Sequence, residues 1–199
     1  MRSRGWLVAL VLGGIVALPA GSRAATYEVD KNHTTVTFKV RHLFSTVVGR
    51  FNRFDGTITL DPDDPSKVEV EGTIDVASID TNVAKRDEHL RSKDFFDVQQ
   101  YPRITFVAAG ATDVDPSGKR GKLQGNLTIH GVTRPVLIEA SYLGEGKDPS
   151  GNVRAGFAGT TKIDRKDFGL NWNQALEAGG VLVGDEIEIE INAEGVLRK

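Results

Sequence analysis

A short polar run contains the residues whose types could support catalysis or metal binding. Arg86, Asp87, Glu88 and His89 stand side by side in the segment 81–102, TNVAKRDEHLRSKDFFDVQQYP. A carboxylate, an imidazole and a cation so close in sequence could transfer protons or ligate a metal ion. Whether they act together depends on the element that carries them.

That element is predicted to be a short helix near residues 83–92, with Asn82 as its N-terminal cap. At about 100° per residue, one helical face carries an apolar and charged set, namely Val83, Arg86, Asp87 and Leu90. The other directions carry Lys85, Glu88 and His89. This division argues against a metal site, because zinc pairs on a helix use His at i and i+4.

Arg86 and Asp87 have two open interpretations. Both could make buried hydrogen bonds that brace the helix across an open end of a barrel, because buried charges normally come paired. Alternatively, Arg86 could donate to the polar head of a ligand, with Asp87 beside it as a second candidate binding residue. The two interpretations are compatible if the helix is a lid.

The chain from residue 26 onward alternates apolar and polar residues, which is typical of half-buried β-strands. Turn sequences at 61–65, 115–118 and 148–151 predict local antiparallel hairpins. Long, locally connected strands with internal glycines favour an all-β fold, an eight-stranded antiparallel barrel, with a two-sheet sandwich as the alternative. The expected strands lie near residues 26–42, 46–60, 67–76, 102–110, 121–130, 134–143, 152–163 and 182–196.

Several apolar side chains are predicted to face the barrel interior. Alternation supplies the inward rows Val36, Phe38, Val40 and Ile74, Phe106, Ala108. The bulkiest candidates for the lining are Phe38, Phe51, Phe54, Phe106, Phe157 and Trp172. An eight-stranded barrel has room either for packed side chains or for one small ligand, and alternation does not decide between them.

Polar candidates for a ligand head group lie near the ends of these rows. His42 follows the inward row of its strand, where an imidazole could bond a head group. Asn173 flanks Trp172 in a connection that could form a polar and aromatic mouth. The four histidines lie on separate segments, so no metal site is predicted, and no cofactor is implied.

The first 24 residues differ from the rest of the chain. Arg2 and Arg4 precede an apolar run at 6–18, and Ser22 and Ala24 are the small residues of a cleavage site. Residues 1–24 are therefore predicted to be a signal peptide, with 25–199 as the exported barrel domain. An uncleaved anchor is the alternative, but the apolar run is shorter than the ~20 residues of a membrane-spanning helix.

Composition restricts the partners and the compartment. Removal of residues 1–24 takes away three arginines and no acidic residue, so the formal net charge falls from −2 to −5. An acidic chain is not suited to holding nucleic acid. Cysteine is absent, which excludes disulfides and a lipidated-cysteine tether, so the bacterial periplasm without a stable membrane anchor is expected. The sequence leaves the oligomeric state open, a homodimer included.

Four ordered motifs resemble the YceI-like family of exported proteins. The first continues the opening run, RDEHLRSKDFFDV at 86–98 followed by Tyr101 and Pro102. The others are VTFKVRH at 36–42, LQGNLTIHGVT at 123–133 and DFGLNWN at 167–173. The similarity spans about residues 26–196.

The resemblance implies a lipocalin-like barrel whose apolar interior holds a polyisoprenoid chain, carried by an isoprenoid quinone or a polyprenyl phosphate. A non-enzymatic lipid-binding protein for transport, storage or stress response is the function it implies. Two alternatives remain, a small barrel enzyme that acts on a hydrophobic substrate and a structural stress protein with a filled core. An enzyme would need an acid and a base facing each other across the cavity.

Overall fold

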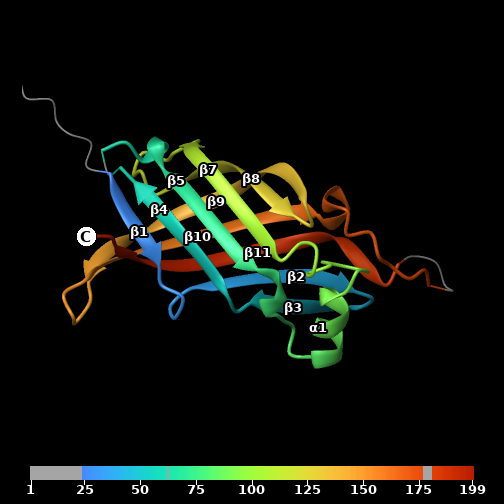
Figure 1. The fold of residues 1–199 in the computed structure, drawn as a ribbon. Coiled ribbons are helices and arrows are strands. Elements are labelled where there is room, and N and C mark those ends of the chain that lie inside the picture. Colours follow the sequence, from blue (N-terminus) through green and yellow to red (C-terminus); the bar gives the residue numbers. More distant parts are fainter. Residues whose placement is uncertain (1–23, 62, 177–180) are drawn as a thin grey trace, which may run out of the picture.

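The computed structural model describes residues 24–61, 63–176 and 181–199. Within them, eleven strands form one antiparallel sheet, accompanied by one α-helix (Figure 1). The strands are β1 (Ala25–Val29), β2 (Thr35–His42), β3 (Ser45–Phe51), β4 (Phe54–Leu60), β5 (Glu69–Asp75), β6 (Ile79–Asp80), β7 (Arg103–Thr112), β8 (Arg120–Ile129), β9 (Val132–Lys147), β10 (Val153–Asp164) and β11 (Val183–Leu197). The helices are α1 (Ala84–Arg91) and three short 3-10 turns, Pro65–Lys67, Val76–Ser78 and Arg165–Phe168.

The sheet closes on itself because β1 pairs with two strands. Tyr27 lies opposite Ile58 of β4 on one edge and opposite Leu197 of β11 on the other. Eight strands therefore complete a ring in the order β1, β4, β5, β7, β8, β9, β10, β11. The predicted eight-stranded antiparallel barrel is confirmed, and the sandwich alternative is wrong.

Two of the predicted strands, 26–42 and 46–60, are each divided into two in the structure, and a further short strand, β6, lies beyond the predicted strand 67–76. β2, β3 and β6 continue β1, β4 and β5 beyond short interruptions and extend the wall at one end of the barrel. β2 pairs with the same edge of β11 that β1 uses further along. The predicted turns at 115–118 and 148–151 are present, since the amides of Gly118 and Gly151 donate to the carbonyls of Asp115 and Asp148 and both glycines adopt left-handed φ values, 68° and 83°. The third predicted turn, 61–65, includes residue 62, which lies outside the described residues.

The helix α1 contacts β6 at this extended end of the barrel (Figure 1). Its position agrees with the predicted helix near 83–92, but Asn82 is not its cap. Val83 occupies the cap position without a side-chain hydrogen bond, and Asn82 adopts a φ of 61°. An eight-residue helix is marginal in isolation, so contacts with the barrel must hold it in place.

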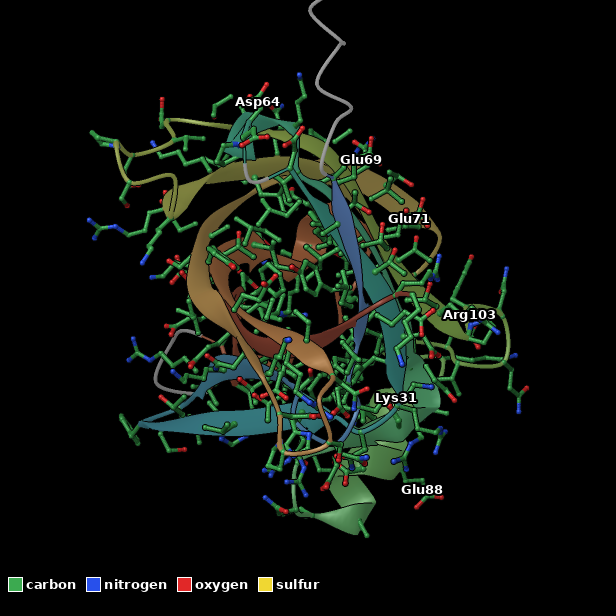
Figure 2. The ribbon with its side chains drawn as sticks, turned by 90° about the vertical axis from the view of Figure 1, so that its left-hand side faces the viewer. Lys31, Asp64, Glu69, Glu71, Glu88 and Arg103 are labelled. Carbon is green, nitrogen blue, oxygen red and sulfur yellow. The ribbon has the colours of Figure 1, made fainter. Side chains whose placement is uncertain are left out.

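The larger part of the core lies at this helix end of the barrel. Phe51, Ile79, Ile104 and Phe168 belong to one buried cluster, and Leu90 of α1 packs against it. A smaller cluster of Ala108, Leu123 and Ile138 lies further along the strands. Figure 2 shows charged side chains such as Glu69, Glu71 and Arg103 on the outside of the ring.

The predicted signal peptide, residues 1–24, lies outside the described residues except for Ala24. Among the residues that the structure describes, no helix has the length and apolar character needed to cross a membrane.

Candidate functional site

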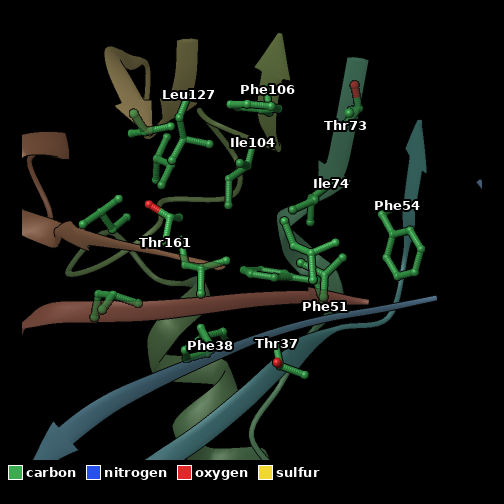
Figure 3. Close-up of a pocket in the computed structure, with 18 of the residues that line it drawn as sticks. Thr37, Phe38, Phe51, Phe54, Thr73, Ile74, Ile104, Phe106, Leu127 and Thr161 are labelled. Atoms are coloured by element: carbon green, nitrogen blue, oxygen red, sulfur yellow. The ribbon is translucent and has the colours of Figure 1, made fainter. Parts of the chain in front are cut away.

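An apolar cavity of about 260 Å³ occupies the barrel interior toward α1. Its walls come from facing strands, with Phe38 and Phe51 on one side and Ile104, Phe106 and Leu127 on the other (Figure 3). The inward residues of β11 complete the wall, namely Ile187, Ile189 and Ile191. Leu90, Phe95 and Phe96, from α1 and the segment after it, close the end.

The interior is not a filled core. Ile187, Ile189 and Ile191 point inward by strand alternation, yet each is only partly buried, because part of its surface faces the cavity. An apolar cavity of about 150 Å³ is already enough to stay dry and bind benzene in an engineered protein. The larger space here can therefore accept an apolar group several carbon atoms long.

A second cavity of about 150 Å³ continues along the barrel away from α1. It is lined by Leu123, Ala140, Tyr142 and Phe157, and Lys119 and Arg120 stand at its edge. β8 carries Arg120 at one end and Leu127 near the other, so the two cavities follow one another along a strand about 30 Å long.

Seven of the twelve predicted binding residues line these cavities. Phe38, Val40, Phe51, Phe54, Ile74 and Phe106 line the larger one. Phe157 lines the smaller one, where it packs edge-on against Tyr27 with ring centroids 5.8 Å apart. Ala108, in contrast, lines neither cavity, because it is 5% exposed and packed against Leu123 and Ile138.

Arg86 and Asp87 lie outside the cavity lining and bond to the same residue, Thr81. Asp87 is buried and accepts hydrogen bonds from the Thr81 amide at 2.9 Å and hydroxyl at 2.5 Å. Arg86 donates to the Thr81 hydroxyl oxygen at 2.7 Å and to its carbonyl at 2.8 Å. This arrangement matches the bracing interpretation, since both side chains fasten α1 to the end of β6.

The remaining three candidates also lie away from the two linings. His42 is partly buried at the end of β2, opposite Ser45 and Val183. Asn173 donates to the Val183 carbonyl at 2.7 Å and accepts from its amide at 3.1 Å, which fastens the connection before β11. Trp172 contacts His89 and Phe95, with ring centroids 4.9 Å and 5.0 Å apart.

The aromatic cluster Trp172, His89 and Phe95 joins α1 to the cavity. Phe95 is 8% exposed and lines the larger cavity, while His89 also bonds to the Asp94 carboxylate at 2.9 Å. A shift of α1 would therefore move the environment of Trp172.

Two arginines at this end were not singled out by the sequence. Arg165 is 3% exposed, lines the larger cavity, and donates to the carbonyls of Gly184, Leu170 and Trp172. Arg91 donates to the carbonyls of Ala77 and Ile79 at 2.8 Å and 2.6 Å, which adds a second fastening of α1. Arg91 lies within the motif at 86–98 and Arg165 lies just before the motif at 167–173, but neither motif reveals acceptors such as Ala77 or Gly184.

Among the residues that the structure describes, Asp30, His33 and Glu194 form a group of possible metal ligands near the C-terminal end of β11. Arg154 already lies between the two carboxylates, 2.6 Å from Asp30 and 2.5 Å from Glu194. The Arg154 guanidinium thus neutralises the two carboxylates in place of a metal ion, so the group is an ion-pair network.

Burial and a carboxylate perturb two tyrosines near the smaller cavity. Tyr27 donates its hydroxyl to Glu145, and burial first and this hydrogen bond second raise the pKa of Tyr27 above its usual range. Burial and the charge of Glu145 also raise the pKa of Tyr142. Both phenols therefore stay protonated at neutral pH. Tyr27 is a hydrogen-bond donor to Glu145, and Tyr142 forms part of the wall of the smaller cavity.

Comparison with known proteins agrees with this geometry. The YceI-like domain model matches residues 27–195. A UPF0312 protein of Pseudomonas paraeruginosa is 42% identical over 193 residues, covering 96% of both chains.

Two solved structures share the fold. Burkholderia cenocepacia BcnA has a TM-score of 0.72 at 25% identity, covering 83% of this chain and 98% of its own. A polyisoprenoid binding domain from Saccharophagus degradans has a TM-score of 0.61 at 14% identity, covering 86% and 98%. The sequence motifs, the closed barrel and the matched domain together show that the chain belongs to the YceI-like family.

Proposed function

We propose that the protein binds one isoprenoid lipid, an isoprenoid quinone or a polyprenyl phosphate, with its prenyl chain inside the barrel. The observation that carries this proposal is the apolar cavity of about 260 Å³, which continues toward a second cavity along the barrel. The polyisoprenoid binding domain of Saccharophagus degradans, which shares the fold, supports the same class of ligand.

Binding is favoured over catalysis by the chemistry of the lining. Among described residues, the ionisable members of the larger cavity are Asp55, Glu71 and Arg165. Asp55 pairs with Lys31, Figure 2 shows the Glu71 side chain on the outside, and Arg165 donates to main-chain carbonyls and Asp185. A prenyl chain in this cavity would therefore contact mainly apolar side chains, as expected for a protein that transports or stores a lipid.

Gly72 offers a direct test of this proposal. A β-carbon added at Gly72 would meet no atom within 4 Å, and Gly72 lines the larger cavity. In Gly72→Leu, the new side chain is expected to fill ligand space with little loss of thermal stability. Each displaced methylene removes about 0.8 kcal/mol of binding, so two or three of them weaken prenyl alcohol binding roughly ten- to fiftyfold.

Gly146→Leu is the matched control, because Gly146 also lies in a strand with open space around it and lines neither internal cavity. Affinity for geranylgeraniol would be measured from the fluorescence of Trp172, whose neighbour Phe95 lines the cavity. Equal binding by wild type and Gly72→Leu, or no binding by wild type, would refute the proposal. Mass spectrometry of lipids that copurify with the exported protein would identify the head group.

We also propose that the protein is exported to the periplasm and begins at Ala25 after cleavage. β1 begins at Ala25, so removal of residues 1–24 would leave every strand of the barrel in place. The expected intact mass of the periplasmic protein is that of residues 25–199. A mass that includes residues 1–24 would contradict cleavage.

A further inference from the structure

Phe106 lies at the junction of the two internal cavities. It lines both the cavity of about 260 Å³ and the cavity of about 150 Å³. Few residues share this position, and they come from strands around the barrel: Ile58, Val70, Phe106, Ile138, Ile191 and Ala193. Phe106 has the largest side chain of this set, so its ring is the bulkiest group shared by the two linings.

The position of the ring follows from two glycines on the neighbouring strands. Gly125 of β8 makes room for it, because a β-carbon at Gly125 would lie 2.5 Å from the Phe106 ring and 2.8 Å from the Ala108 β-carbon. On the other side, Gly72 of β5 is paired with Phe106 and leaves open space. The ring therefore rests against β8 and faces a free volume at β5.

We infer that Phe106 sets the length of the isoprenoid chain that the barrel accepts. A short chain fills the larger cavity alone, whereas a longer chain must pass the Phe106 ring to reach the smaller cavity. The inference rests on the proposed function, and it adds a selectivity for chain length to it. Figure 3 shows the ring projecting into the pocket above Ile104.

Phe38 provides a matched control for a truncation of Phe106. It has the same side chain, also packs over a glycine, Gly49 of β3, and lines the larger cavity but not the smaller one. Phe38→Ala therefore removes the same atoms from the wall without opening the passage.

The experiment measures the affinities of wild type, Phe106→Ala and Phe38→Ala for geranylgeraniol and for the longer solanesol, by displacement of an apolar fluorescent probe. In Phe106→Ala, the affinity for solanesol relative to geranylgeraniol is expected to rise roughly tenfold. In Phe38→Ala, this ratio stays near the wild-type value. Phe106→Leu, a smaller change that keeps the interior better filled, is expected to shift the ratio in the same direction by less.

An unchanged ratio in both Phe106 variants, or an equal rise in Phe38→Ala, overturns the role of Phe106 while the proposed function stands. Failure of wild type to bind either alcohol would instead overturn the proposed function and this inference with it.

Discussion

In Arg165→Met, the free energy of unfolding is expected to fall by about 3–5 kcal/mol, because a buried, multiply bonded cation is replaced by a side chain without donors. Arg165 is 3% exposed and donates to the carbonyls of Gly184, Leu170 and Trp172 and to Asp185. Hydrogen bonds to a charged group contribute about 1.5–3 kcal/mol each, and their contributions are not fully additive. Thermal unfolding followed by circular dichroism would measure the loss.

Arg120→Met is the control for this prediction. The Arg120 side chain is 77% exposed and pairs with Asp115 at 3.2 Å. Exposed ion pairs contribute about 0–1 kcal/mol, so this variant should unfold close to the wild-type temperature. Similar losses in the two variants would show that the buried hydrogen bonds of Arg165 do not hold the helix end of the barrel together.

The strand pattern was predictable because alternation is a local property. Each β-strand needs only its own residues to show which face is inward, so the eight runs and the inward row Val36, Phe38, Val40 were found from the sequence. The division of the runs 26–42 and 46–60 was not visible, because it depends on where a strand changes its pairing partner. β1 and β2, for example, meet the same edge of β11 at different places.

The cavity itself could not be predicted from alternation. Periodicity gives the direction of a side chain, whereas an empty space depends on the distance to the opposite wall. Ala108 was expected to border this space and is instead packed against Leu123 and Ile138. Gly72, in the same kind of inward position, faces open space.

The polar candidates show the same limit. The helical face that carries Arg86 and Asp87 was predicted, but their common partner Thr81 belongs to the preceding turn. The partners of Arg165 include Gly184 and Asp185, about twenty residues away, which no local pattern connects. Sequence motifs therefore indicated the important segments, and only the fold assigned each side chain its contact.

Arg154→Met is expected to reduce the pH dependence of stability in acid. Arg154 contacts Asp148 at 2.7 Å, Asp30 at 2.6 Å and Glu194 at 2.5 Å, so it ties the turn before β10 to the turn after β1 and to β11. Its guanidinium, with Asn152 second, lowers the pKa of Asp148 from 3.8 to about 2. The same cation, with His33 second, holds the pKa of Asp30 well below its usual range.

A carboxyl group whose pKa is lower in the folded state than in the unfolded state stabilises the fold at pH values above its unfolded-state pKa. This stabilisation is lost as the pH falls through the folded-state pKa. In wild type, this contribution is complete above about pH 4 and disappears as the pH falls through about 2. In Arg154→Met, the melting temperature at pH 7 should be lower, and its decrease between pH 4 and pH 2 should be shallower. Ser150 and Asn152 still donate to Asp148, so part of the decrease remains.

Arg198→Met tests whether any surface arginine would have this effect, because Arg198 pairs with Glu28 at 2.8 Å while both side chains are more than half exposed. Melting temperatures from pH 2 to pH 7 should follow wild type in this control. If the melting temperature of Arg154→Met falls below pH 4 as steeply as that of wild type, the acid sensitivity arises from other carboxylates. A shallower decrease restricted to Arg154→Met would instead assign it to the network that joins β10 and β11 to the β1–β2 turn.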